Sequence, residues 1–298
     1  MKYAFIDDNK KRWPLSLLCE VPEVSASGYH QHQQRRYKSP PGKRAISNDA
    51  LLAQIKAIHA QVKGEYGWPR MHKALVVQGI RVGKERVQRL MQQHGIRARH
   101  KRKWIATTDS KHHLPIAPNL LARDFTPGEP NQTWTSDITY IGTDAGWQYL
   151  AVIIDLFSRQ IVGWSMQSHM KAELVTDALR MAWFRRRPEA GLIMHSDRGS
   201  QYCGHLFQGA LKAYDMRSSM SRKGNCWDNA PTESLWSSLK VARIHGRLFK
   251  SAREAKDEVM DWISFYNAHR LHSTPGYVSP MQFEKNWCAQ RSSYQMTA

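Results

Sequence analysis

The stretch from residue 134 to residue 168 reads WTSDITYIGTDAGWQYLAVIIDLFSRQIVGWSMQS. Three runs within it, 134–141, 147–155 and 161–168, are rich in β-branched and aromatic residues and predict strands. A glycine-containing turn separates the first two runs, which indicates an antiparallel hairpin. We therefore expect three consecutive antiparallel strands at the start of a sheet.

Helical and strand-like patterns alternate downstream of these strands. Residues 172–186 place apolar side chains at helical spacing, and the short apolar run LIMHS (192–196) is typical of a buried strand. Three antiparallel strands followed by alternating helices and strands predict an α/β fold with a mixed sheet. The remaining expected elements are a helix at 205–214, a strand at 216–220, a helix from Thr232 to about Ile244 and a last amphipathic helix at 251–270.

The N-terminal part of the chain has an all-helical pattern instead. We expect an arm at 1–47, followed by a helix that Ser47 or Asn48 can cap. A second helix begins near Pro69, because proline is favoured in the first helical turn. The residues at 78–80 contain a glycine and form the turn that leads into a third helix.

This third helix, from about 83 to 94, is basic on the side away from its apolar residues. A helix, a glycine turn and a basic second helix favour a helix-turn-helix whose second helix enters the DNA major groove. An ordinary pair of helices with a solvated basic face fits the same pattern. The expected DNA contacts of this region, 48–103, are Lys84, Arg86, Arg89, Arg97, Arg99, Lys101, Arg102 and Lys103.

The charge distribution points to the same kind of partner. The formal net charge is +19, and 23 of the 44 basic side chains but only 8 of the 25 acidic ones lie in residues 1–111. Such a basic region attracts nucleic acid through its phosphates. The sequence has no apolar run long enough for a membrane span and no secretory signal, so we expect an intracellular protein without a membrane partner. Its four cysteines form no paired motif, which argues against a disulfide scaffold or a cysteine zinc site.

Three carboxylates lie at positions where a solvated surface role is least expected. Asp137 is in the middle of a strand, Asp197 follows the strand at 192–196, and Glu233 opens a helix. If they converge, hard oxygen ligands of this kind hold Mg²⁺ or Mn²⁺, and two such ions can support phosphoryl transfer. Each also has a structural explanation: a satisfied strand-edge acid, a turn residue in Ser-Asp-Arg-Gly, and an acid at the positive end of a helix.

The sequence motifs around these carboxylates resemble those of a known family. The chain is similar, from about residue 50 to 287, to the OrfB transposases of the third large bacterial insertion-sequence family, which are DDE enzymes similar to retroviral integrases. The resemblance implies an α/β ribonuclease-H-like catalytic core, with a mixed five-stranded sheet and flanking helices, preceded by an all-α helix-turn-helix DNA-binding region. It also implies that Asp137, Asp197 and Glu233 bind two Mg²⁺ or Mn²⁺ ions. The motifs that carry the resemblance are WTSDITYI, YLAVIIDLFSRQIVGWSM, HSDRGSQY, SMSRKGNCWDNAPTESLWSSLK and FYNAHRLHSTPGYVSP.

Two further positions follow from the resemblance. Lys240 lies two helical turns after Glu233, where the integrase relatives have a basic residue that contacts the element end. Asn229 lies in the loop that approaches the DNA tip in those relatives. A solvated helix lysine and a turn asparagine are the structural alternatives. Leu-Trp follows Glu233 where relatives more often have other apolar pairs, and no triad residue is missing.

The resemblance predicts a bacterial DNA transposase that acts at the nucleoid. It would cleave the element end and join the freed 3′-hydroxyl to another phosphodiester. Its implied partners are the terminal inverted repeats and target DNA, further copies of the chain on paired ends, and the upstream-frame product of the element. A non-catalytic regulator of transposition and a nuclease without strand transfer are the alternatives. The expected divisions are an arm (1–47), a helix-turn-helix region (48–103), a linker (104–130), the catalytic core (131–246) and a C-terminal helical extension (247–298).

Overall fold

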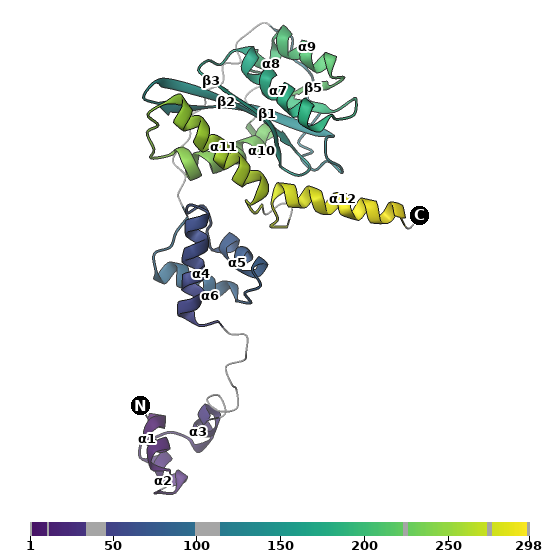
Figure 1. Ribbon diagram of the computed structural model, residues 1–298. Coiled ribbons are helices and arrows are strands. Elements are labelled where there is room, and N and C mark those ends of the chain that lie inside the picture. The colour runs from purple at the N-terminus through teal and green to yellow at the C-terminus, as the bar shows by residue number, and fades with distance from the viewer. Residues whose placement is uncertain are drawn as a thin grey trace.

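The computed structural model shows a sheet-containing core, a helical region beside it and a small N-terminal helical arm (Figure 1). Within the described part of the chain, no helix is both long and apolar enough to cross a membrane. The structure describes residues 2–10, 12–33, 46–98, 114–222, 226–272 and 276–296.

The core is built on a five-stranded sheet in the order β3-β2-β1-β4-β5. The three strands that open it are antiparallel neighbours, as the sequence predicts, whereas β4 runs parallel to β1 and β5 parallel to β4. The α/β core with a mixed five-stranded sheet is therefore confirmed. The strands are β1 (Thr133–Thr143), β2 (Gly146–Asp155), β3 (Ile161–Gln167), β4 (Ile193–Ser196) and β5 (Arg217–Met220).

Successive side chains of a strand point to opposite faces of the sheet. Both faces carry apolar side chains here, so helices cover both. Trp134 and Ile153 pack against α7 (Ala172–Arg186), α8 (Ser200–Cys203) and α9 (His205–Ala213) on one face. Ile141 and Val152 pack on the other face against α10 (Ala230–Leu239) and α11 (Ala252–Ala268). Gly163 lets α7 approach closely, since a Cβ there would lie 2.3 Å from the Ala178 carbonyl oxygen.

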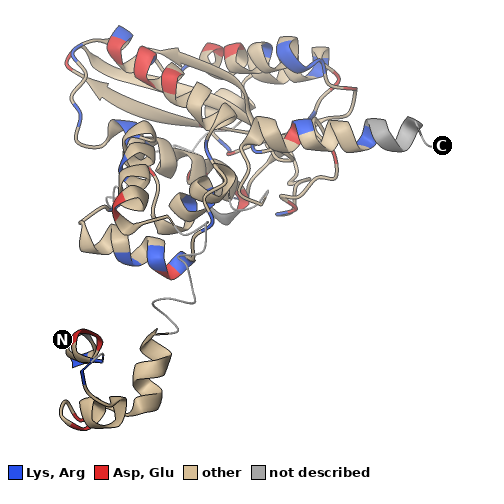
Figure 2. Ribbon diagram, turned by 60° about the horizontal axis from the view of Figure 1, so that its bottom comes forward, with Lys and Arg blue, Asp and Glu red and all other residues tan. Residues whose placement is uncertain are grey.

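Three helices form the region expected to be a helix-turn-helix. They are α4 (Asn48–Gln61), α5 (Trp68–Val77) and α6 (Lys84–Gln93). Ser47 is the residue that caps α4, where its side chain accepts a hydrogen bond from the Ala50 amide. The apolar sides of the three helices meet in one buried cluster, to which each contributes, as with Ile55, Leu75 and Val87. Basic residues are spread over several elements of this region (Figure 2).

The helical arm at the N-terminus has a small core of its own. It contains α1 (Lys2–Asn9), α2 (Leu15–Glu20) and α3 (Ala26–Gln33). Ile6, Leu18 and Tyr29 are buried together, and the Tyr29 hydroxyl donates a 2.8 Å hydrogen bond to Asp7. The arm is therefore a folded helical unit within its described residues.

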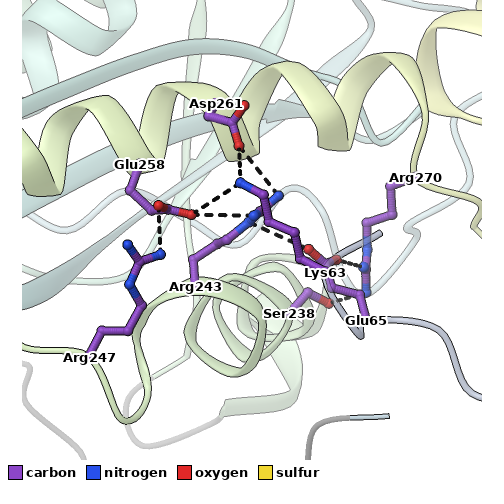
Figure 3. Close-up of polar contacts among 8 residues, drawn as sticks. All are labelled: Lys63, Glu65, Ser238, Arg243, Arg247, Glu258, Asp261 and Arg270. Atoms are coloured by element: carbon purple, nitrogen blue, oxygen red, sulfur yellow. Dashed lines mark hydrogen bonds and ion pairs between the residues drawn. The ribbon is translucent and has the colours of Figure 1, made fainter. Parts of the chain in front are cut away.

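An ionic cluster with a buried centre and exposed outer members joins the helix-turn-helix region to the core (Figure 3). Glu65, just before α5, forms an ion pair with Arg270, which follows α11. Arg243 is buried between Glu65, Glu258 and Asp261, with its guanidinium nitrogens 3.3–3.6 Å from their carboxylate oxygens. We call the set Lys63, Glu65, Ser238, Arg243, Arg247, Glu258, Asp261 and Arg270 the ionic cluster.

The elements at two places differ from the sequence-based expectation. The helix that carries Glu233 begins at Ala230 rather than Thr232, and it ends at Leu239. A π-helical segment, Lys240–Ile244, then continues the chain. The helix at 251–270 is not the last one, because α12 (Pro280–Met296) follows. Its Phe283 and Trp287 pack on Phe157, an interaction between residues far apart in the sequence that no local pattern reveals.

Part of the expected linker lies against the sheet. The amide of Leu120 donates a 2.9 Å hydrogen bond to Ser219 in β5, and Arg123 forms an ion pair with the buried Asp228. Arg222 also holds Asp228, and these arginines keep the pKa of its carboxyl well below the usual range. Residues 114–130 thus follow the edge of the core, next to the loop that precedes α10.

Candidate functional site

The sheet brings two of the predicted carboxylates to one place. In the parallel pairing of β1 with β4, Thr135 lies opposite His195. Asp137 and Asp197 each follow two residues later, so both project at the point where the β4 strand ends. The pairing with β4 stops at Thr135, and the edge of β1 beyond it borders a cleft.

Asp137 is held by two hydrogen bonds. Its Oδ1 accepts from the Ile138 amide at 2.8 Å, and its Oδ2 accepts from the Trp236 indole Nε1 at 2.9 Å. Burial and the nearby charge of Asp197 nevertheless raise the pKa of Asp137 to about 7, with a smaller contribution from Glu233. The side chains around Asp137 therefore leave its negative charge undercompensated, which favours a bound cation.

Asp197 occupies a turn as well as the edge of the cleft. Its Oδ1 accepts a 2.9 Å hydrogen bond from the Gly199 amide, and a Cβ at position 199 would lie 3.0 Å from that oxygen. The turn explanation that the sequence left open is thus correct for its local bonding. It does not exclude the other role, because Asp197 also lines the cleft and acts electrostatically on Asp137.

Glu233 lies in the first turn of α10, near the two aspartates. The side chain is half-buried, and burial raises the pKa of its carboxyl. Its charge also contributes to the raised pKa of Asp137. Among the described residues, however, no three His, Cys, Asp or Glu side chains are close enough together to hold a metal ion. Asp137 and Asp197 are brought together, and Glu233 would have to move closer to complete a shared site.

Lys240 lies beside the carboxylates. Its Nζ is 4.9 Å from the centre of the Tyr140 ring, an attractive geometry for a cation over an aromatic face. Burial lowers the pKa of the Lys240 ammonium, while the charge of Asp137 acts in the opposite direction. Lys240 is therefore partly buried beside an aromatic ring, and contact with DNA stays a prediction.

Asn229 is buried and not exposed at the surface. Its Oδ1 accepts a 2.9 Å hydrogen bond from Thr135 in β1 and another from Thr232 in α10. These bonds tie the start of α10 to the strand that carries Asp137. Asn229 thus has a structural role in this arrangement, and direct contact with DNA stays a prediction.

The residues predicted to contact DNA in the helical region fall into three groups. Lys84, Arg89 and Arg97 are exposed. The Arg86 guanidinium instead donates to Asn48 Oδ1 and, at 2.6 Å, to the Ile46 carbonyl. The remaining four, Arg99, Lys101, Arg102 and Lys103, lie outside the described residues.

A cleft of about 410 Å³ runs along the uncovered part of β1. Carboxylate, hydroxyl and amide side chains alternate in it with aromatic and apolar ones. This mixture provides oxygen ligands next to flat apolar surfaces. The lining residues are Asp137, Ile138, Thr139, Tyr140, Trp147, Tyr149, Met170, Asp197, Ser200 and Gln201.

Three aromatic residues near the carboxylates are absent from the sequence-based site. Trp236 lies three residues after Glu233, a spacing that places both on one side of a helix and is the only local signal for it. Tyr140 and Trp147 lie on adjacent antiparallel strands close to the turn between them. Their hydrophobic strand pattern predicts sheet packing, so only the register reveals that they border the cleft.

Family models match both the helical region and the core of this chain. A model described as an integrase core domain matches residues 127–226, another with the same description matches 214–280, and an HTH-like domain model matches 47–104. Among solved structures, the simian T-cell lymphotropic virus intasome gives a TM-score of 0.44 at 15% identity, covering 78% of this chain and 74% of that one. The HTLV-2 integrase catalytic core domain in complex with magnesium gives 0.39 at 14% identity, covering 53% and 98%.

Curated relatives are much closer in sequence. An insertion element IS600 uncharacterized 31 kDa protein of Shigella sonnei is 42% identical over 271 residues, which cover 91% of this chain and 98% of the relative. The transposase InsF for insertion sequence IS3A of Escherichia coli (strain K12) is 41% identical over 290 residues, which cover 95% and 98%. With an HTH-like region, an integrase core and this identity over nearly its whole length, the chain belongs to the IS3-family transposases.

Proposed function

We propose that this protein cleaves the ends of its insertion element and joins them to DNA by transesterification. The observation that carries the proposal is the pair Asp137 and Asp197, which lie together where β4 ends, so that the charge of Asp197 raises the pKa of Asp137. A carboxylate pair of this kind with Glu233 nearby fits divalent cations, for which oxygen is the preferred ligand. The family relatives named as transposases support the same activity.

The residues proposed to hold Mg²⁺ or Mn²⁺ are Asp137, Asp197 and Glu233. Two such ions supply Lewis acidity that favours attack on a phosphodiester and departure of the leaving oxygen. The chain itself supplies orientation. The Ile138 amide and the Trp236 indole fix both oxygens of Asp137, and the Gly199 amide fixes one oxygen of Asp197. Because these carboxylate oxygens are already held in position, the site needs less reorganisation during the reaction.

Positive charge beside this site is proposed to hold the DNA. Lys240 is proposed to neutralise a phosphate close to the carboxylates, and the exposed Lys84, Arg89 and Arg97 are proposed to contact DNA from the helical region. The terminal inverted repeats and target DNA are the proposed partners. Further copies of the chain on paired ends and the upstream-frame product are proposed to complete the active assembly at bacterial nucleoid DNA.

The test is strand joining with a labelled oligonucleotide that carries the cognate element end, in Mg²⁺ or Mn²⁺. Wild type is expected to join strands, and Glu233→Gln is expected to bind the same DNA without joining it. Asp257→Asn, an exposed carboxylate on α11, is the matched control and should join normally. Nicks without joined products would favour a nuclease. Binding without any product, even with the upstream-frame product added, would favour a regulator.

A further inference from the structure

The cleft beside the carboxylates has an aromatic end. Tyr140, Trp147 and Tyr149 line it together with Asp137 and Asp197. Trp147 is 56% exposed, although it lies in a strand next to a well-packed core. Packing of the sheet does not explain why the Trp147 ring is exposed to solvent. A large exposed aromatic side chain beside a pocket is typical of a binding surface.

The Trp147 ring lies against residues of the neighbouring strand β1. Trp147 is paired in register with Gly142, and a Cβ at position 142 would lie only 3.4 Å from the Trp147 ring. The edge of the ring system is further fixed by Tyr140, whose ring centre is 5.1 Å away at an interplanar angle of 83°. Trp147 is therefore held by its neighbours while much of its surface stays accessible.

A cation also lies close to the same tyrosine. The Lys240 Nζ lies 4.9 Å from the centre of the Tyr140 ring. Carboxylates, aromatic rings and an ammonium group are thus gathered at one cleft. A nucleotide presents the matching groups: a phosphate for the cation and a flat base for the rings.

We propose that Trp147, held at its edge by Tyr140, forms a stacking surface for one unpaired base of the DNA substrate near the phosphate that reacts. The inference rests on the proposed function, because the carboxylates fix where that phosphate lies. Bases inside a duplex cover each other's faces, so a base can stack on Trp147 only after leaving its pair. The ligand class is accordingly a frayed or flipped nucleotide rather than intact duplex.

The first test measures stacking without catalysis. Duplexes with unpaired nucleotides around the scissile phosphate carry the fluorescent base 2-aminopurine at one position at a time, in EDTA. Wild type is expected to quench the fluorescence at one position. Trp147→Ala should lose that quenching and bind these duplexes about 10-fold more weakly, as expected for one lost base–aromatic stack. Trp147→Phe, which keeps a ring, should restore most of both signals.

The matched control is Phe184→Ala, which removes an aromatic ring of similar exposure (60%) from the end of α7. It should quench and bind like wild type. A second test replaces the quenched nucleotide with an abasic one. Wild type should then bind about 10-fold more weakly, whereas Trp147→Ala should not distinguish the two duplexes.

Unchanged quenching in Trp147→Ala would overturn the proposal. So would a loss of binding that is equal in Trp147→Ala and Phe184→Ala. A change in oligomeric state with normal quenching would also overturn it and assign the ring to a contact between copies of the chain. Strand joining by wild type is scored separately. Its absence with quenching intact would refute the transposase chemistry and leave the stacking surface standing.

Discussion

The indole Nε1 of Trp236 donates a hydrogen bond to Oδ2 of Asp137 at 2.9 Å, across 99 residues of sequence. The bond links α10, which carries Glu233, to β1, which carries Asp137. Trp236 is itself buried in the core on that face of the sheet. The helix and the strand that supply two of the three carboxylates are therefore fixed to each other by a group that has no acidic or basic function.

Replacing this indole should reduce catalysis without removing the fold. Trp236→Phe keeps an aromatic ring but loses the hydrogen bond, and a bond to a charged group contributes about 1.5–3 kcal/mol. We expect the strand-joining rate to fall at least about 10-fold, with DNA binding unchanged. Trp262→Phe is the control, because the Trp262 Nε1 has no hydrogen-bond partner among the described residues and lies in the same apolar cluster. Equal losses in the two variants would contradict the positioning role.

Stability without divalent cations should depend on the protonation of Asp137. Its pKa is raised from 3.8 to about 7 in the folded chain, so the folded state holds this proton more tightly than the unfolded state. The resulting stabilisation is complete below about pH 4 and is lost as the pH rises through about 7. Thermal unfolding in EDTA should therefore show a steeper loss of Tm between about pH 5 and pH 8 for wild type than for Asp137→Asn.

The same two proteins test whether a cation relieves this cost. At about pH 8, Mg²⁺ should raise the Tm of wild type, since a cation bound by the carboxylates stabilises their ionised form. Asp137→Asn should show little change. An equal rise in both proteins would indicate that Mg²⁺ binds elsewhere on the chain.

The ionic cluster should contribute strongly to stability through Glu65. Glu65→Gln leaves the buried Arg270 without its carboxylate partner, and breaking a buried pair on one side costs about 3–5 kcal/mol. The control is Asp257→Asn, whose partner Arg253 is 91% exposed and 3.9 Å away. Urea unfolding should show a change within about 0.5 kcal/mol for this control. Similar values for the two variants would show that the buried pair is not important.

Basic residues of α6 should separate into two functional groups. Lys84→Ala and Arg89→Ala remove exposed charges and should weaken DNA binding, each lowering the slope of log affinity against log salt by about 0.9. Arg86→Ala should instead lower the Tm, because its guanidinium binds Asn48 and the Ile46 carbonyl. Normal Tm with lost affinity in Arg86→Ala would place this arginine among the DNA contacts.

The sequence predicts the core well where the signal is local. The three opening strands, a helix cap at Ser47 or Asn48 and the helix at 172–186 follow from side-chain periodicity and capping chemistry alone, and the structure assigns the cap to Ser47. The placement of Asp137 beside Asp197 required the resemblance to a family, since periodicity does not tell which strands become neighbours. Local patterns also could not predict α12, whose packing on Phe157 is a tertiary contact.

Parts of the site could not be predicted from the sequence, because they depend on contacts between distant residues. The charge of Arg86 predicts a DNA contact, but the sequence does not show that its partners are Asn48 and the Ile46 carbonyl. Asn229 looked like a loop residue, and only the fold shows that it is buried against Thr135. Trp147 fitted a strand pattern that says nothing about the cleft beside the strand. In each case the deciding information is the identity of a distant neighbour.

The ionic cluster also limits how such proteins can be recombined. Glu65 lies between α4 and α5 of the HTH-like region, whereas Arg243 and Arg270 follow helices of the core, and all three are buried. A chimera that takes its helical region from a relative without an acid at this position would leave the buried Arg270 without its carboxylate, and Arg243 with only Glu258 and Asp261. An exchanged helical region therefore has to bring an acid at position 65, or the partner residues on the core have to be exchanged with it.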